Sequence, residues 1–448
     1  MEFIVFPVTQ RPLPTRQDGP KGYSLPVVTV CIVTLGTLGD VLPLCALGAG
    51  LTRAGHTVRV ATHDHYRRFV LDHGLEHASM PLDPAELFSG VWGSDWLASR
   101  NNPLRFMSGL ARVGRAVIPH MTRDARAACA GADAVVFTPL GMVAHHIAEQ
   151  RGIPAFLAAL QPITPTTRFP SVVAPAGLRL GRGYNLLSHL ATEQAFWLPW
   201  RRQFNRVRRE QFDLPPMRFG GVGRQLRRQG TPHLYGFSPL VVPPPDDWPG
   251  WAHVTGYWFP STRDLWGVPE ELQRFLDAGP APVCVGFSSL KVDDPEALTR
   301  TVIAALRRAG RRGVLLRGWG ALQPGQHGSD MLVIDSAPHD YLFERVAAVV
   351  HPGGAGTCAA SLRAGIPSVV VPGFSDQFFW AQRLVALGVA PPSLRWRNLD
   401  AAVLGHAIER AATDTAIRQA ARGARRRLRA EDGVGRAVST IQHYLEAA

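Results

Sequence analysis

Short β-rich runs alternate with helical patterns along most of this 448-residue chain. In the first half, VVTVCIVTL (27–35) precedes a helical pattern at 41–55, and further strands are expected at 56–62, 132–138 and 154–160. This alternation is typical of parallel sheets covered by helices, because parallel strands need long crossover connections. We therefore predict an α/β protein, and its length exceeds what one ordinary core holds.

The alternation pauses at a proline-rich stretch and then starts again. PLVVPPPDDWPGWAHVTGYWFPST (239–262) contains six prolines and three tryptophans, which favours a linker. New strands are expected at 282–290, 313–319 and 331–338. Two doubly wound domains that face each other across a cleft follow from this pattern. The expected division is a loose extension at 1–26, an N-terminal domain at 27–240, a linker at 241–262 and a C-terminal domain at 263–430.

The net charge of +13 is carried almost entirely by arginine. Arginines cluster at 201–228 and 422–429, where helical spacing predicts solvated helix faces. The alternative is a weak peripheral contact with anionic lipid or with an acidic partner. Nucleic acid is not an expected partner, and no apolar run approaches the roughly 18 residues needed to span a bilayer.

Five cysteines are scattered along the chain without a CxxC pair. Their apolar neighbours predict reduced core thiols, which favours the cytoplasm. Residues 1–26 have no basic start before an apolar stretch, so they do not resemble a signal peptide.

The stretch HPGGAGTCAASLRAGIPSVVVPGFSDQ (351–377) carries the clearest chemical signal. Its glycine turn leads from a strand into a helix, and free N–H groups at a helix start attract anions such as a diphosphate. The turn alone is equally compatible with tight packing of a helix on a strand. Asp376 and Gln377 follow the next strand, and a carboxylate beside an amide suits sugar hydroxyls. Together the glycine turn and the Asp-Gln pair predict a nucleotide-sugar site.

These segments resemble the donor-binding signature of the family 1 glycosyltransferases with the GT-B fold, chiefly the sterol glucosyltransferase and glycopeptide or natural-product branch. The resemblance covers about residues 27–445 and is strongest over 283–390. It implies two Rossmann-like domains, with a C-terminal helix at 431–448 that packs back on the N-terminal domain.

The resemblance also implies roles for individual residues. His351, Gly353, Gly356 and Thr357 would contact the donor diphosphate. Asp376 and Gln377 would hold the sugar, Ser289 would lie near the diphosphate, and Trp319 would stack on the base. The chain departs from the family at Ser288 and Pro352, which replace a glycine and a histidine of the family motifs, and at Ser336, which replaces the usual tryptophan.

The catalytic base is expected in GTLGD (36–40), at the start of the helix after the first strand. From local sequence alone, Asp40 reads better as a helix cap than as a base. The resemblance reverses this preference, since related branches have a GTRGD-like motif whose aspartate is the proposed base; Leu38 replaces its arginine here. TPLGM (138–142) supplies no second acid, so Asp40 would act alone, with inversion at the anomeric carbon.

The resemblance therefore implies hexose transfer from a UDP- or dTDP-sugar to a hydroxyl of a hydrophobic natural-product or sterol-like acceptor. No metal or other cofactor is expected beyond the nucleotide-sugar co-substrate. Leu38, His145 and Phe169 are candidates for acceptor contacts, although most aromatics of 84–240 are explained as core residues. The alternative is a nucleotide-sugar epimerase of the same architecture or a non-catalytic relative that only binds the nucleotide sugar.

Overall fold

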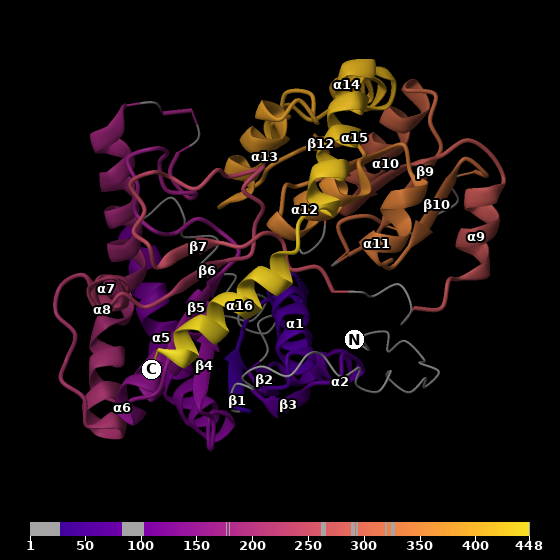
Figure 1. Ribbon diagram of the computed structural model, residues 1–448. Coiled ribbons are helices and arrows are strands. Elements are labelled where there is room, and N and C mark those ends of the chain that lie inside the picture. Colours follow the sequence, from indigo (N-terminus) through magenta and orange to yellow (C-terminus); the bar gives the residue numbers. More distant parts are fainter. Residues whose placement is uncertain are drawn as a thin grey trace.

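The computed structural model describes residues 27–82, 103–175, 177–178, 180–260, 266–287, 292, 294–318, 320–323 and 328–447. Two parallel β-sheets, each flanked by helices, form two α/β domains that lie side by side (Figure 1). This is the predicted fold class, and the sheets follow from the buried apolar runs of the two strand series.

In the described part of the chain, the first sheet contains seven strands, and every neighbouring pair is parallel. Its interior strand β1 is largely apolar and buried because helices cover both faces of the sheet. In spatial order the strands are β3 (Glu76–Ser79), β2 (Thr57–Thr62), β1 (Thr29–Val33), β4 (Ala134–Phe137), β5 (Ala155–Ala159), β6 (His233–Tyr235) and β7 (Ala252–Val254). Its helices are α1 (Leu38–Arg53), α2 (Arg67–Asp72), α5 (Pro103–Ala128), α6 (Val143–Arg151), α7 (Arg182–Phe212) and α8 (Gly221–Gln229).

The second sheet has five parallel strands among the residues described. In spatial order they are β10 (Met331–Ile334), β9 (Gly313–Leu316), β8 (Val283–Gly286), β11 (Ala348–His351) and β12 (Ser368–Val370). The helices of this domain are α9 (Glu270–Asp277), α10 (Pro295–Arg308), α11 (His339–Leu342), α12 (Ala355–Ala364), α13 (Gln377–Ala386), α14 (Ala401–Thr413) and α15 (Thr415–Arg429).

Each sheet has one point where the strand order reverses. β1 lies between β2 and β4 in the first sheet, and β8 lies between β9 and β11 in the second. Loops after neighbouring strands run to opposite faces at such a point, which leaves room for a ligand beyond the carboxyl ends of the strands. The loops that follow β1 and β11 are therefore the places to look for a site.

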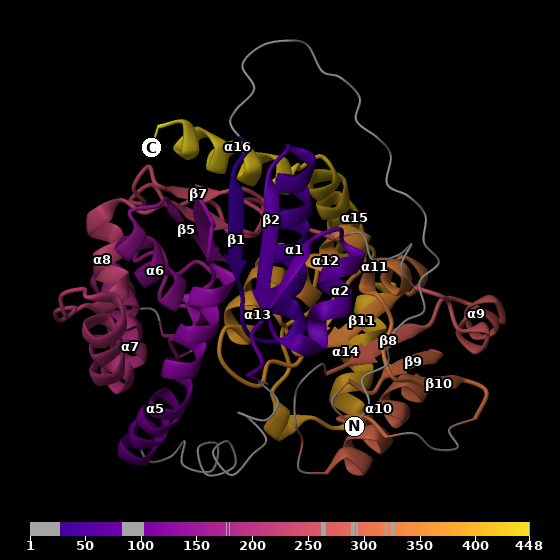
Figure 2. The same cartoon turned by 90° about the horizontal axis from the view of Figure 1, so that it is seen from below.

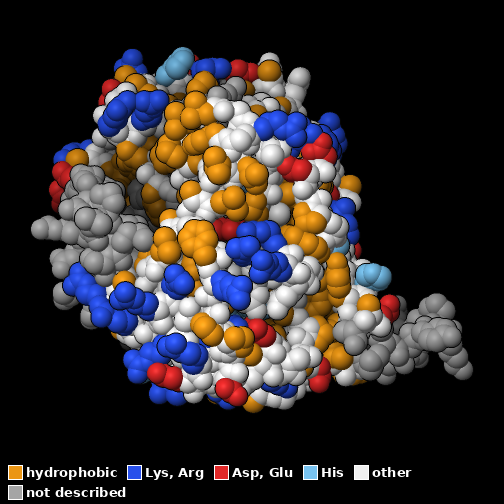
Figure 3. Space-filling model, turned by 90° about the vertical axis from the view of Figure 1, so that its left-hand side faces the viewer, with side chains coloured by type: hydrophobic (Ala, Val, Ile, Leu, Met, Phe, Trp, Pro, Cys, Tyr) orange, Lys and Arg blue, Asp and Glu red, His pale blue; other side chains and the backbone are white. Residues whose placement is uncertain are grey.

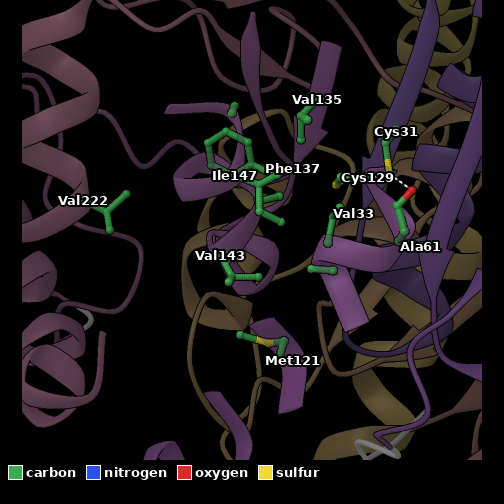
Figure 4. Packing of buried hydrophobic residues seen from close by; sticks show 14 of the residues in the cluster. Cys31, Val33, Ala61, Met121, Cys129, Val135, Phe137, Val143, Ile147 and Val222 are labelled. Atoms are coloured by element: carbon green, nitrogen blue, oxygen red, sulfur yellow. Dashed lines mark hydrogen bonds between the residues drawn. The ribbon is translucent and has the colours of Figure 1, made fainter. Parts of the chain in front are cut away.

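Buried aliphatic and aromatic side chains join each sheet to its helices. On one face of the first sheet, Val33 and Phe137 from the strands pack with Val143 and Ile147 of α6 (Figure 4). The five cysteines are all buried, and none forms a disulfide. Another cluster of buried side chains contains Phe169 of the first domain and Trp380 of the second, so the two domains share a core.

Strand β7 lies inside the stretch interpreted above as a linker. It pairs with β6, His233 opposite Ala252, and so extends the first sheet beyond residue 241. Only three residues form the strand, and the prolines around it dominate the local composition. A strand this short gives no usable alternation pattern.

The last helix described, α16 (Gly433–Glu446), returns to the first domain and packs along α1 (Figures 1 and 2). Val438 and Ile441 of α16 are buried in the same cluster as Leu47 of α1. At Gly50 of α1 the two helices approach so closely that an added Cβ would lie 2.4 Å from Val434 Cγ1. The contact requires a small residue at that position.

The arginine cluster at 201–228 lies on α7 and α8, at the left of Figure 1. Figure 3 views that side, where basic and hydrophobic side chains are interspersed. Exposed Arg206 pairs with Glu210, but Arg208 is buried and binds Glu149, so this cluster is only partly a solvated face. Of the helices described, none combines the length and the apolar character needed to cross a bilayer.

The contact between α16 and α1 should contribute measurably to stability. Because Ile441 is fully buried, Ile441→Ala is expected to lower the free energy of unfolding by about 2–5 kcal/mol. Urea denaturation followed by circular dichroism measures this change. Leu71→Ala on the exposed side of α2 is the control, and equal effects of the two substitutions would contradict the packing described here.

Candidate functional site

The turn that follows β1 is held in a conformation that only glycine tolerates. Gly36 has φ +128°, and an added Cβ would lie 2.5 Å from Asp40 Oδ2. The N–H of Gly36 donates to His63 Nε2 at 3.0 Å, and His63 directly follows β2. The ends of two neighbouring strands thus fix the position of the GTLGD segment.

Asp40 lies in the first turn of α1 and closes a capping box with Thr37. Its Oδ2 accepts hydrogen bonds from Thr37 N at 2.8 Å and from Thr37 Oγ1 at 3.0 Å. The N-cap residue is therefore Thr37, and Asp40 supports the cap from the third helical position. Its Oδ1 has no hydrogen-bond partner among the described residues, so one oxygen remains available to a ligand.

The pKa of Asp40 lies above its ordinary value of 3.8. Burial is the main cause, since it disfavours the charged form, and the two hydrogen bonds from Thr37 act in the opposite direction. The negative charge of Asp376 raises the pKa of Asp40 further. Asp376 belongs to the second domain, so the structure brings these two carboxylates into electrostatic reach of each other.

The glycine turn after β11 opens α12 as the sequence predicts. Gly353 has φ +94°, and a Cβ there would lie 2.9 Å from Val370 Cγ1, so the turn requires glycine. Gly354 is the N-cap and supplies no capping side chain. A Cβ added at Gly354 or Gly356 would meet no atom within 4 Å. The space that a side chain would fill at these two glycines is therefore open among the residues described, and the first N–H groups of α12 lack intrahelical acceptors.

His351 ends β11 and is almost fully buried. Burial lowers the pKa of its imidazole to about 3, with a further contribution from His339, so the ring is neutral at physiological pH. Its Nδ1 accepts the N–H of Gly353 at 3.1 Å, which places the ring proton on Nε2. That Nε2 has no hydrogen-bond partner in the part of the chain described. The residue therefore offers one neutral N–H donor beside the glycine turn.

Asp376 follows β12 and accepts two hydrogen bonds at the same oxygen. Trp380 Nε1 donates to Oδ2 at 2.9 Å, and Gln161 Nε2 of the first domain donates to it at 3.2 Å. Burial raises the pKa of Asp376, while these two donors lower it. The contact from Gln161 joins the two domains at the candidate site.

Gln377 uses its side-chain carbonyl locally. Its Oε1 accepts the N–H groups of Gly373 at 2.8 Å and of Phe374 at 3.2 Å, which closes the turn before α13. Its amide NH₂ is then the only side-chain group left for a ligand. The two members of the Asp-Gln pair therefore differ in what they can offer.

The three candidates for acceptor contacts lie in different surroundings. Leu38 is 42% exposed at the start of α1, two residues before Asp40. Phe169 is buried at the domain boundary, with its ring 5.6 Å from that of Phe379. His145 is 3% exposed inside the first domain, where its ring lies 5.8 Å from that of Phe137.

His145, His146 and Glu149 come close enough to form a metal-like cluster. However, the Arg208 guanidinium binds both oxygens of Glu149, at 2.6 and 3.1 Å, and donates to His146 Nδ1 at 3.1 Å. A cation already occupies the position that a metal would take, and it neutralises the carboxylate. We interpret this cluster as a buried structural ion pair.

Some residues singled out in the sequence lie outside the described residues. They include Ser289 and Trp319, two of the donor-site candidates, and Ser288, which departs from the family pattern. The arrangement described above rests on the remaining candidates.

Sequence reasoning missed Gln161, His63 and Trp380. Gln161 and His63 each follow a parallel strand within two residues, so the edge of the sheet is a signal that could have found them. Trp380 lies one helical turn after Asp376, where an indole N–H can reach a carboxylate.

Comparison with known families gives two matches. Residues 30–170 match the glycosyltransferase family 28 N-terminal domain. Residues 327–434 match the C-terminal domain of the erythromycin biosynthesis protein CIII-like family.

Similar curated proteins include sterol 3-beta-glucosyltransferases of Leptosphaeria maculans and Emericella nidulans. Both are 35% identical to this chain and align with 94% of it. The alignments cover 29% and 30% of those proteins, so the chain spans about three tenths of their length.

Similar solved structures include the glycotransferase of kitacinnamycin, with TM-score 0.69, 20% identity, and coverage of 94% of this chain and 99% of that one. SnogD from Streptomyces nogalater has TM-score 0.61, 21% identity, and coverage of 93% and 99%. VinC in complex with DTDP has TM-score 0.63, 17% identity, and coverage of 94% and 100%. At these low identities, the structural similarity shows a common fold and nothing more.

The buried His145 predicts a pH-dependent stability. Burial lowers its pKa to about 4, so below pH 6.5 the unfolded chain takes up a proton that the folded chain does not. His145→Phe removes this effect. The change in unfolding free energy that the substitution causes is therefore expected to be about 2 kcal/mol more favourable at pH 5 than at pH 7.5. Urea denaturation at both pH values measures this difference. His406→Phe on the surface is the control, and a pH-independent effect of His145→Phe would contradict the prediction.

Proposed function

The chain belongs to the family 1 glycosyltransferases with the GT-B fold, and from this membership we propose that it transfers a hexose from a nucleotide diphosphate sugar to a hydroxyl of a hydrophobic acceptor. One observation carries the proposal. Asp40, after β1 of the first domain, lies within electrostatic reach of Asp376, after β12 of the second domain. A base and a sugar-binding carboxylate on opposite sides of a reacting sugar require such a placement.

The donor diphosphate would bind at the start of α12. Its oxygens would accept the free N–H groups of the first helical turn and the Nε2–H of His351, and the helix dipole favours negative charge there. These contacts strengthen as the diphosphate leaves with its full charge. They therefore lower the activation barrier of the transfer in addition to holding the donor. Stabilisation by these donors makes an obligatory metal unnecessary in this proposal.

Asp376 would accept hydrogen bonds from the sugar hydroxyls, and the Gln377 amide would donate to the sugar. The two donors on Asp376 Oδ2 fix the orientation of the carboxylate before the sugar arrives. Because one of them is Gln161, binding of the sugar would depend on the docking of the two domains.

Asp40 would take the proton of the acceptor hydroxyl. Its Oδ2 is held by Thr37, which leaves Oδ1 for the incoming hydroxyl, and its raised pKa makes it a stronger base than an ordinary aspartate. The deprotonated oxygen attacks the anomeric carbon from the side opposite the diphosphate. The carbon–oxygen bond to the diphosphate breaks as the new one forms, so the configuration inverts.

The acceptor is proposed to be a sterol-like or natural-product alcohol. The relatives named as sterol 3-beta-glucosyltransferases favour a sterol and glucose, and the structure of VinC with DTDP favours including thymidine diphosphate sugars. Exposed Leu38 beside Asp40 offers an apolar contact for such an acceptor. UDP-glucose and a dTDP-hexose, each tested with sterol and polyketide alcohols, distinguish these pairs.

Removal of the base should reduce turnover more than binding. Asp40→Asn keeps the size of the side chain and is expected to lower kcat by about 10²–10⁴-fold, because general-base catalysis contributes that much. Release of nucleotide diphosphate with a saturating acceptor measures this rate. Asp64→Asn, on the exposed turn after β2, is the control. An unchanged kcat in the Asp40 variant would exclude the role of Asp40 as the base.

The electrostatic interaction between Asp40 and Asp376 predicts a shift in the pH profile of kcat. Asp40 acts only when ionised, so the rate falls as the pH drops through its pKa. Asp376→Asn removes a negative charge that raises this pKa, so the acidic limb of kcat should move to lower pH. The donor KM should also rise about 10–100-fold, since hydrogen bonds to a charged group are lost. Asp277→Asn, exposed on α9, should leave both unchanged, and an acidic limb that stays in place would contradict the coupling.

A further inference from the structure

A cavity of about 540 Å³ lies in the second domain, at the edge of the sheet opposite the glycine turn. Its wall includes Ala281, Ala347 and Pro367, which lie within two residues before β8, β11 and β12. His351 and Asp376, by contrast, follow the carboxyl ends of β11 and β12. Because all strands of this sheet run in the same direction, the cavity and the proposed donor site occupy opposite edges.

One wall of the cavity is a column of arginines on α15. The helix buries Ile417, Ala421, Ala424 and Leu428 against the domain. Arg418, Arg422 and Arg425 each follow one of these positions, so they form a second stripe beside the apolar one, and all three line the cavity. Arg311, in the loop between α10 and β9, adds a fourth guanidinium from another element.

The positive charge in this cavity is only partly balanced. Glu344 is the single carboxylate of the lining, and it is shared by Arg429 at 2.6 Å and Arg425 at 3.6 Å. Arg425 also donates to the carbonyl of Ala364, at the negative end of α12. The guanidinium groups of Arg311, Arg418 and Arg422 make no hydrogen bond or ion pair with any of the residues described.

We propose that this cavity is a second anion site, which binds the phosphate group of a soluble compound or of a lipid headgroup. Guanidinium groups pair with phosphate oxygens through two parallel hydrogen bonds, and three of them without partners suit a multivalent phosphate. The volume is within the range of small-molecule sites. Because its residues lie at the opposite sheet edge from the donor site, this site neither uses nor requires the proposed transfer reaction.

The test uses inorganic tripolyphosphate as the probe, in 150 mM salt, with binding measured by isothermal titration calorimetry. Arg418→Gln with Arg422→Gln should weaken binding at this site about tenfold or more, since each removes charged hydrogen bonds. Arg311→Gln removes a guanidinium from a different element and should weaken the same binding step. A thermal unfolding curve for each variant shows that it is folded.

The matched control lies on the same helix. Arg426→Gln with Arg427→Gln removes the same charge from exposed positions of α15 that do not line the cavity. This control should change the dissociation constant by less than twofold. Equal weakening in both double variants would mean that only the net charge matters, and no difference from wild type in any variant would mean that the cavity binds no phosphate. Either result overturns the proposal.

A second measurement distinguishes a free phosphate compound from a lipid headgroup. Phosphatidylcholine vesicles with and without phosphatidylinositol 4-phosphate are sedimented with the wild-type chain and with both double variants. Sedimentation that needs the phosphorylated lipid and Arg418 with Arg422 assigns the phosphate to a headgroup. Tripolyphosphate binding without sedimentation assigns it to a soluble compound, and both results support the phosphate site.

Discussion

The hydrogen bond from Gln161 to Asp376 is the contact on which the proposed site depends. It joins residues 215 positions apart and brings a carboxylate of the second domain toward Asp40 of the first. Two buried carboxylates so near each other are unfavourable, and each has donors that offset part of the cost: Thr37 for Asp40, and Trp380 with Gln161 for Asp376. Either carboxylate is therefore sensitive to the docking of the domains.

Both halves of the proposed site arise from the same rule of sheet topology. Asp40 follows β1 and His351 ends β11, each at the point where the strand order of its sheet reverses. The glycines at 36 and 353 adopt backbone angles that other residues rarely take, and each lets a neighbouring group come close. The sheets supply the framework, and two glycine turns place the chemistry at its edges.

The fold class, most strands and the residues of the glycine turn could be predicted from the sequence because they depend on local pattern. Burial of a whole strand produces an apolar run, and a helix start after glycines has a recognisable composition. Gln161 and the burial of His145 could not be predicted in this way, since both depend on contacts between elements far apart in sequence. Strand β7 was missed because three residues carry no periodicity. Thr37, rather than Asp40, proved to be the N-cap because both residues suit that position and only the backbone decides.

The chain passes between its domains at two places that touch. The outgoing segment after β7 meets the start of α16 at Gly433, where an added Cβ would lie 2.4 Å from the carbonyl oxygen of Tyr257. Arg436 donates to the carbonyl of Thr255 at 2.6 Å, and Ser238 donates to Glu431 at 2.6 Å. Because the two covalent connections are fastened to each other at one point, we expect any opening of the domains to turn about that point. Such a rotation would move Asp376 away from Asp40 and leave α16 packed on α1.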